Sequence, residues 1–180
     1  PTISSPVSIP VYGEFITARW GYEALAVKQF IDNKYEQQFY KFDKAKSKGN
    51  YMKNYWYVEL KGKLDNILND LENGSKSNDF TGNLLLVSNE IKKGKVELPD
   101  IGFEYANFLT PEKITPEVAK AALDYIESVR KYYIMYYNNA SDQKDSIIDK
   151  LQNEDNEGFH KLQASYYNKS LEEFVTNKNE

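Results

Sequence analysis

The chain of 180 residues has no cysteine and only one histidine, His160. The absence of cysteine excludes thiol catalysis, thiolate metal ligands and disulfides. One histidine cannot build a metal site of several histidines, and no serine or cysteine motif marks a nucleophile for His160 to activate. We therefore expect neither a metal ion nor a catalytic residue in this chain.

Glycine clusters, long apolar runs and a positive net charge are missing as well. The nine glycines stand singly, so the chain has no phosphate-binding loop and no dinucleotide-binding motif. No apolar run approaches the roughly 20 residues that cross a bilayer. The net charge of -4 gives no basic field that would attract nucleic acid. These features predict a soluble domain with no cofactor, no nucleic-acid partner and no enzymatic activity of its own.

Aromatic residues and helical periodicity are what the sequence has in abundance. Aromatic residues make up 14% of the chain, and apolar side chains recur at spacings of three and four in most segments. The pattern predicts an all-α fold, an irregular antiparallel bundle of about five or six helices. We expect an extended lead-in over residues 1–13, a single helical domain over 14–175, a long irregular connection near 95–114 and a polar tail over 176–180.

Local signals predict where these helices begin and end. Gly49 and the turn at Asn73 and Gly74 are expected to end helices. Thr115 as N-cap, followed by proline at the first helical position, predicts the start of a long helix. The polar run over residues 138–145 is expected to bend or break that helix.

The run RKYYIMYYNN, residues 130–139, is the strongest candidate for a binding surface. Tyr132 and Tyr136 continue an apolar stripe and are predicted to be core residues, whereas Tyr133 and Tyr137 lie about 100° around the helix axis. Core packing is one interpretation of Tyr133 and Tyr137, and a ligand-facing aromatic surface that includes Trp56 is the other. The predicted stripe comprises Val118, Ala122, Tyr125, Val129, Tyr132 and Tyr136.

Arg19, Trp20, Tyr22 and Glu23 stand in a segment, residues 15–27, that has no other formal charge than Arg19 and Glu23. These two lie one helical turn apart, so an ion pair is the favoured interpretation. A catalytic pair would need a second carboxylate or a histidine converging from elsewhere. Because tryptophan, tyrosine and arginine on an apolar helix also suit the boundary between lipid and water, this segment is a candidate membrane-proximal motif.

Three stretches of the sequence resemble a known family: GEFITARWGYEALAVKQFIDNKYEQQFYKFDKAKS (13–47), YWYVELKGKLDNI (55–67) and YYNKSLEEFVTNKNE (166–180). They are similar to the extracytoplasmic region of large bacterial ABC transporters of the Bacteroidetes, in which an ATPase domain is fused to an ABC-2 type permease related to the White and drug-resistance exporters. In this family the segment similar to Arg19–Ala24 follows a late transmembrane helix. The resemblance therefore implies that the motif lies just outside the bilayer.

The resemblance also implies a location and partners. The domain would lie on the periplasmic side of the inner membrane, with residues 1 and 180 joined to transmembrane helices and a second transporter half as partner. The start of the chain at Pro1 agrees with a piece of a longer protein. ATP would bind only in the ATPase domain of the parent protein, because this chain lacks a phosphate-binding loop and an ABC signature motif.

The function implied by the resemblance is to cap or gate the exit side of the translocation path, or to contact the transported molecule or an outer partner. The alternative is a stand-alone extracytoplasmic ligand-binding module, which would use Trp56, Tyr133 and Tyr137 as an aromatic stacking surface. A glycosidase ranks last, because it would need two carboxyl groups in a cleft and no catalytic motif marks them.

Overall fold

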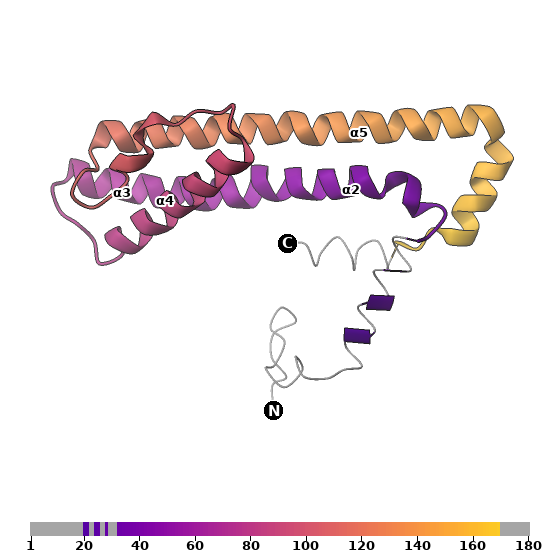
Figure 1. Cartoon of the computed structure of the whole chain (residues 1–180), viewed down its shortest axis with the longest axis horizontal. Helices are drawn as coiled ribbons and strands as arrows, with labels where there is room; N and C mark the ends of the chain where they lie inside the picture. The colour runs from indigo at the N-terminus through magenta and orange to yellow at the C-terminus, as the bar shows by residue number, and fades with distance from the viewer. Residues whose placement is uncertain (1–19, 22–23, 26–27, 29–31, 170–180) are drawn as a thin grey trace. The chain divides into compact units, whose positions relative to one another are not determined.

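The computed structural model describes residues 20–21, 24–25, 28 and 32–169 (Figure 1). These residues form helices and loops, and none of them belongs to a strand. The all-α prediction is therefore confirmed for this part of the chain. The predicted lead-in and the predicted polar tail lie outside the described residues. So does most of the predicted first helix, whose described positions are all helical.

The first long helix continues through three segments without a break. It consists of α2 (Glu36–Tyr51), the π-helical turn η2 (Met52–Trp56) and α3 (Tyr57–Glu72). The prediction that Gly49 ends a helix is wrong, because Gly49 is buried inside α2. Its missing side chain serves a close approach to a neighbouring helix, which local sequence does not reveal.

Two further helices follow, α4 (Phe80–Glu97) and α5 (Pro116–Tyr166), and the connection between them contains the short 3-10 helix η3 (Glu104–Phe108). The polar run 138–145 does not break α5, contrary to the prediction. The helical backbone is interrupted instead at Asp155, whose carboxylate accepts the backbone N–H of the residue three positions later at 2.8 Å. Asp155 thus caps the helical turn that follows it. The described helices are thus α2–η2–α3, α4 and α5, the last interrupted at Asp155, and the predicted count of five or six helices is not matched.

Capping interactions fix three of the helix ends. The side-chain oxygen of Asn33 accepts the backbone N–H of Tyr35 at 2.9 Å in front of α2. Gly74 has a φ of 67°, the left-handed conformation that glycine adopts easily after a helix, and it follows the end of α3 as predicted. The hydroxyl of Thr115 accepts the backbone N–H of Val118 at 3.4 Å, which confirms the predicted start of α5.

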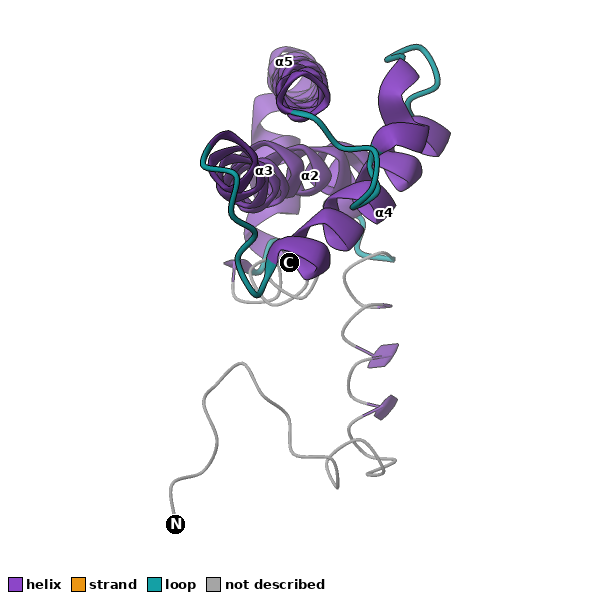
Figure 2. Ribbon diagram, turned by 90° about the vertical axis from the view of Figure 1, so that its left-hand side faces the viewer, coloured by secondary structure: helices purple, strands orange, loops and turns teal. Residues whose placement is uncertain are grey.

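The chain divides into two compact units, residues 45–141 and residues 1–44 with 142–180. In the unit 45–141, Figure 2 shows α3 and α5 nearly end-on, with α4 beside α3. Its core is lined by apolar residues of these helices and of the connection before α5, among them Leu60, Leu64, Ile67, Phe80, Leu84, Val87, Ile91, Phe103, Leu109, Ile126 and Val129. The other unit has a smaller core of Tyr35, Phe39 and Phe159. The predicted single domain over 14–175 stays a prediction.

Gly49 lies at a tight contact between α2 and α5. A Cβ atom added at Gly49 would lie 3.0 Å from the Cβ of Tyr137 and 3.2 Å from the backbone oxygen of Tyr133. Gly62 in α3 offers a matched comparison, because a Cβ atom there would have no neighbour within 4 Å. Substituting alanine at each of the two glycines therefore distinguishes the effect of helix propensity from that of packing.

We expect Gly62→Ala to raise the free energy of unfolding by about 0.5–1 kcal/mol, because alanine favours a helix over glycine. Gly49→Ala should lower it by about 1 kcal/mol, because the helix backbones must move apart to admit the methyl group. Urea unfolding followed by circular dichroism measures both changes. Equal stabilisation by the two substitutions would show that the contact at Gly49 is not tight.

Candidate functional site

The candidate membrane-proximal motif is only partly described. Arg19, Tyr22 and Glu23 lie outside the described residues, so their predicted ion pair and surroundings stay predictions. Trp20 is described, is helical and is 52% exposed. Leu25, on the same predicted helix, is exposed as well. Two large apolar side chains of this segment, Trp20 and Leu25, therefore have exposed surface.

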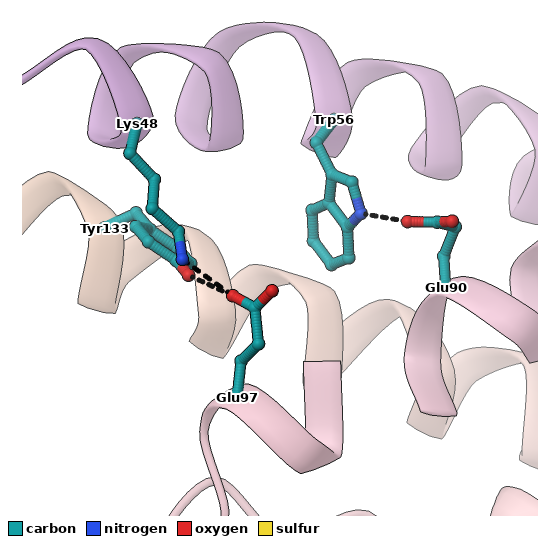
Figure 3. Close-up of polar contacts among 5 residues, drawn as sticks. All are labelled: Lys48, Trp56, Glu90, Glu97 and Tyr133. Carbon is teal, nitrogen blue, oxygen red and sulfur yellow. Dashed lines mark hydrogen bonds and ion pairs between the residues drawn. The ribbon is translucent and has the colours of Figure 1, made fainter. Parts of the chain in front are cut away.

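Trp56 is not a ligand-facing residue, contrary to the candidate role given to it above. Its side chain is only 7% exposed and belongs to the core of the unit 45–141. The indole N–H donates to the Glu90 carboxylate of α4 at 3.0 Å (Figure 3). Glu90 also pairs with Lys93 at 2.6 Å. Trp56 therefore links η2 to α4 by packing and by a satisfied hydrogen bond.

Tyr133 is likewise buried, at 3% exposure, and joins three helices. Its hydroxyl donates to Glu97 Oε2 at 3.3 Å, and Lys48 Nζ donates to the same oxygen at 2.8 Å (Figure 3). These residues come from α5, α4 and α2, respectively. The Lys48–Glu97–Tyr133 cluster thus fastens the end of α4 to the two long helices. The ligand-facing interpretation of Tyr133 is wrong, and core packing is correct.

The protonation states of the Lys48–Glu97–Tyr133 cluster follow from its contacts. The hydrogen bond from Lys48 lowers the pKa of Glu97, and the hydrogen bond to Glu97 raises the pKa of Lys48. Burial raises the pKa of the Tyr133 hydroxyl. At neutral pH the cluster is therefore an ion pair with a neutral phenol. The cluster suits a structural role better than proton transfer, because the raised pKa of Tyr133 keeps its hydroxyl protonated.

The apolar stripe of α5 is shifted by one residue at its tyrosines. Tyr132 and Tyr136, predicted to be core residues, are exposed, and the buried position after Val129 is Tyr133. Residues three and four positions after Val129 both lie near its face of the helix, so spacing alone did not decide between them. The hydrogen-bond partner Glu97 favours Tyr133, because a buried hydroxyl needs one.

Tyr137 is half-buried, and two lysines lie against its ring. Lys53 Nζ is 3.6 Å from the ring centroid, and Lys46 Nζ is 5.6 Å from it. Both ammonium groups gain from the negative face of the ring. A ligand that stacks on the face of Tyr137 occupied by Lys53 would have to displace this lysine. Tyr137 is therefore partly exposed, but its ring is already in contact with cations.

The exposed aromatic surface of α5 is the Tyr132–Tyr136 pair, which sequence reasoning assigned to the core. The two rings stack 6.2 Å apart with an angle of 15° between their planes. Met135 beside them is also exposed. The sequence has two pairs of tyrosines at a spacing of four, Tyr132 with Tyr136 and Tyr133 with Tyr137. If Tyr133 faces the core, the helical period turns Tyr132 and Tyr136 outward.

Neither a metal-ligand cluster nor a membrane-spanning helix occurs among the described residues. No three of their histidine, aspartate and glutamate side chains gather closely enough to hold a metal ion. None of the described helices is long and apolar enough to cross a membrane. No protein-family model, no curated protein and no solved structure matches the chain. The residues themselves and the sequence resemblance are therefore what indicates a function.

Proposed function

We propose that this chain is an extracytoplasmic domain of an ABC-2 type exporter permease, located on the periplasmic side of the inner membrane. It would cap or gate the exit side of the translocation path, or contact the transported molecule or an outer partner. The observation that carries the proposal is the segment 15–27, with its exposed Trp20 and only Arg19 and Glu23 as charges. The resemblance over residues 13–47, 55–67 and 166–180 supports it.

The helical fold suits a mechanical role of this kind. The long helices α2–α3 and α5 are fastened to α4 by the Lys48–Glu97–Tyr133 cluster and by the Trp56–Glu90 hydrogen bond. Packed helices move as rigid bodies, so a displacement of flanking membrane helices would be passed on through them. ATP would be hydrolysed in the ATPase domain of the parent protein, and a second transporter half would complete the machine as in other symmetric assemblies.

The test uses the two tryptophans of the chain, Trp20 and Trp56. Because Trp56 is buried, a change of emission on adding vesicles of phosphatidylethanolamine and phosphatidylglycerol reports on Trp20. We expect a blue shift on vesicle addition and quenching by brominated lipid, since interfacial tryptophans enter the headgroup region. Trp20→Phe, which retains Trp56, is the matched control and should show neither effect.

Two results would contradict the proposal. Emission unchanged by vesicles, together with no co-sedimentation, would exclude a membrane-proximal segment at Trp20. Reading the parent gene on both sides of the region that encodes residues 1–180 gives an independent result. A parent gene without flanking membrane-spanning segments would exclude the transporter function even if the vesicles bind.

A stand-alone ligand-binding module is the second candidate, and it needs a different surface from the one predicted. Trp56 and Tyr133 are buried, and the ring of Tyr137 is in contact with two lysines. The exposed Tyr132–Tyr136 pair is the surface that such a module would use. The transporter function ranks first because it also accounts for the segment around Trp20.

A further inference from the structure

A cavity of about 340 Å³ lies between α5 and the connection that leads into η3. All its lining residues fall between 101 and 128, inside the unit 45–141. The volume is within the range of roughly 300–1,000 Å³ typical of small-molecule sites. Five of the lining residues determine its chemistry: Phe103, Glu104, Tyr105, Asp124 and Tyr125.

Three aromatic rings belong to the lining of this cavity. Phe103 contacts Tyr125 at 5.3 Å and Tyr105 at 6.1 Å between ring centroids, with the planes tilted or edge-on. Phe103 and Tyr125 are buried core residues, but Tyr105 is exposed and lies outside the core cluster. Phe108, also exposed, extends the row from Tyr105 at 6.1 Å. Core packing therefore accounts for the first two rings and not for the outer two.

Two carboxylates, Glu104 and Asp124, complete the lining. Both side chains are exposed, and neither forms an ion pair with any residue that the structure describes. Lys95 Nζ donates to the backbone oxygen of Phe103 at 3.2 Å. Glu104 and Asp124 are the charged residues among those that line the cavity, and both are negative.

The combination of ring faces and unpaired carboxylates selects one class of ligand. Ring faces carry partial negative charge and attract organic cations, as in the aromatic cages that recognise quaternary ammonium groups. A metal ion is a poorer fit, since it favours several oxygen or nitrogen ligands together and no such group of three occurs in the described part of the chain. An anion would meet repulsion from Glu104 and Asp124.

We propose that this cavity binds a small organic cation of the ammonium class. The positive group would lie against Tyr105 and Phe103, and Asp124 and Glu104 would balance its charge. The buried hydroxyl of Tyr125 lies against Gly94 of α4, 2.9 Å from where a Cβ atom there would stand, so Tyr125 contributes its ring rather than its hydroxyl to the cavity. The proposal does not depend on the transporter function, because it uses only residues of this unit.

The test compares choline with 3,3-dimethylbutan-1-ol, which has the same shape without the positive charge. Each is titrated into the full 180-residue chain and followed by amide chemical shifts in nuclear magnetic resonance spectra. We expect saturable shifts around residues 102–105 with choline, and binding of the neutral alcohol at least about fivefold weaker. Equal affinity for the two probes, or no shift at these residues, would overturn the proposal.

Variants distinguish choline binding in the cavity from a general attraction of choline to an acidic protein. Asp124→Asn keeps the shape of the side chain and should weaken choline binding about fivefold, with little effect on the alcohol. Tyr105→Leu should weaken choline binding to a similar extent by removing a ring face. Glu112→Gln, an exposed carboxylate of the same connection outside the cavity, is the control and should change nothing. Choline binding that persists unchanged in both cavity variants would also overturn the proposal.

Discussion

Replacing Asp43 by leucine should lower the free energy of unfolding by about 3 kcal/mol, because the substitution leaves the Lys144 ammonium without its partner. Lys144 Nζ contacts both carboxylate oxygens of Asp43, at 2.6 and 2.8 Å. The two side chains are only 17% and 9% exposed, and the ammonium also lies 5.4 Å from the centroid of the Phe39 ring. Water cannot readily replace the carboxylate there. Urea unfolding followed by circular dichroism measures the loss.

Two controls identify the cause of this loss. The exposed pair Lys61 and Asp65 in α3 has a similar short contact, yet Asp65→Leu should change the free energy of unfolding by less than about 0.5 kcal/mol. The double variant Asp43→Leu with Lys144→Met should recover most of the stability, to within about 1 kcal/mol of the parent, since no buried charge remains. A loss for Asp43→Leu no larger than for Asp65→Leu would show that the Asp43–Lys144 pair is effectively solvated.

Local interactions were the predictable part of this fold. Thr115 and Pro116 set the start of α5 through groups within one helical turn, and Gly74 ends α3 through its own backbone freedom. Both features are complete within a few residues, so the sequence contains all the information that they need. The all-helical class followed in the same way from periodicity.

Long-range contacts were the part that the sequence could not supply. Gly49 resembles a helix end, but its role depends on Tyr137, which approaches from another helix. Tyr133 is buried because Glu97, 36 residues earlier in the chain, accepts its hydroxyl. Trp56 and Glu90 are separated by a similar distance in the sequence. A periodic pattern identifies a helix face but not the residues that pack against it. The sequence therefore predicted Tyr132 as a core residue in place of its neighbour Tyr133.

The sequence did not predict the candidate cavity, for a related reason. The connection near 95–114 was predicted to be irregular, and its residues Phe103, Leu109 and Ile114 belong to the core. Tyr105 is exposed and lines the same cavity as Asp124 of α5. Both facts follow from the path of this connection rather than from any motif. Irregular segments have no period from which the direction of a side chain can be read.

Leu64→Ala should lower the free energy of unfolding by about 3–4 kcal/mol, because it removes a fully buried side chain and leaves a cavity in the core of the unit 45–141. Leu85→Ala in α4 is the matched control. Leu85 is exposed, so the same change should cost less than about 0.5 kcal/mol. Equal losses for the two variants would mean that Leu64 is not packed as the structure places it.

The same measurements test the predicted single domain over residues 14–175, because Leu64 and Asp43 belong to different compact units. α2 and α5 each have residues in both units, so unfolding one unit would leave two helices frayed within the other. We therefore expect Leu64→Ala and Asp43→Leu to lower the midpoint of one common unfolding transition. Two separate transitions, with each variant shifting only one of them, would divide the chain into two domains at residues 44–45 and 141–142.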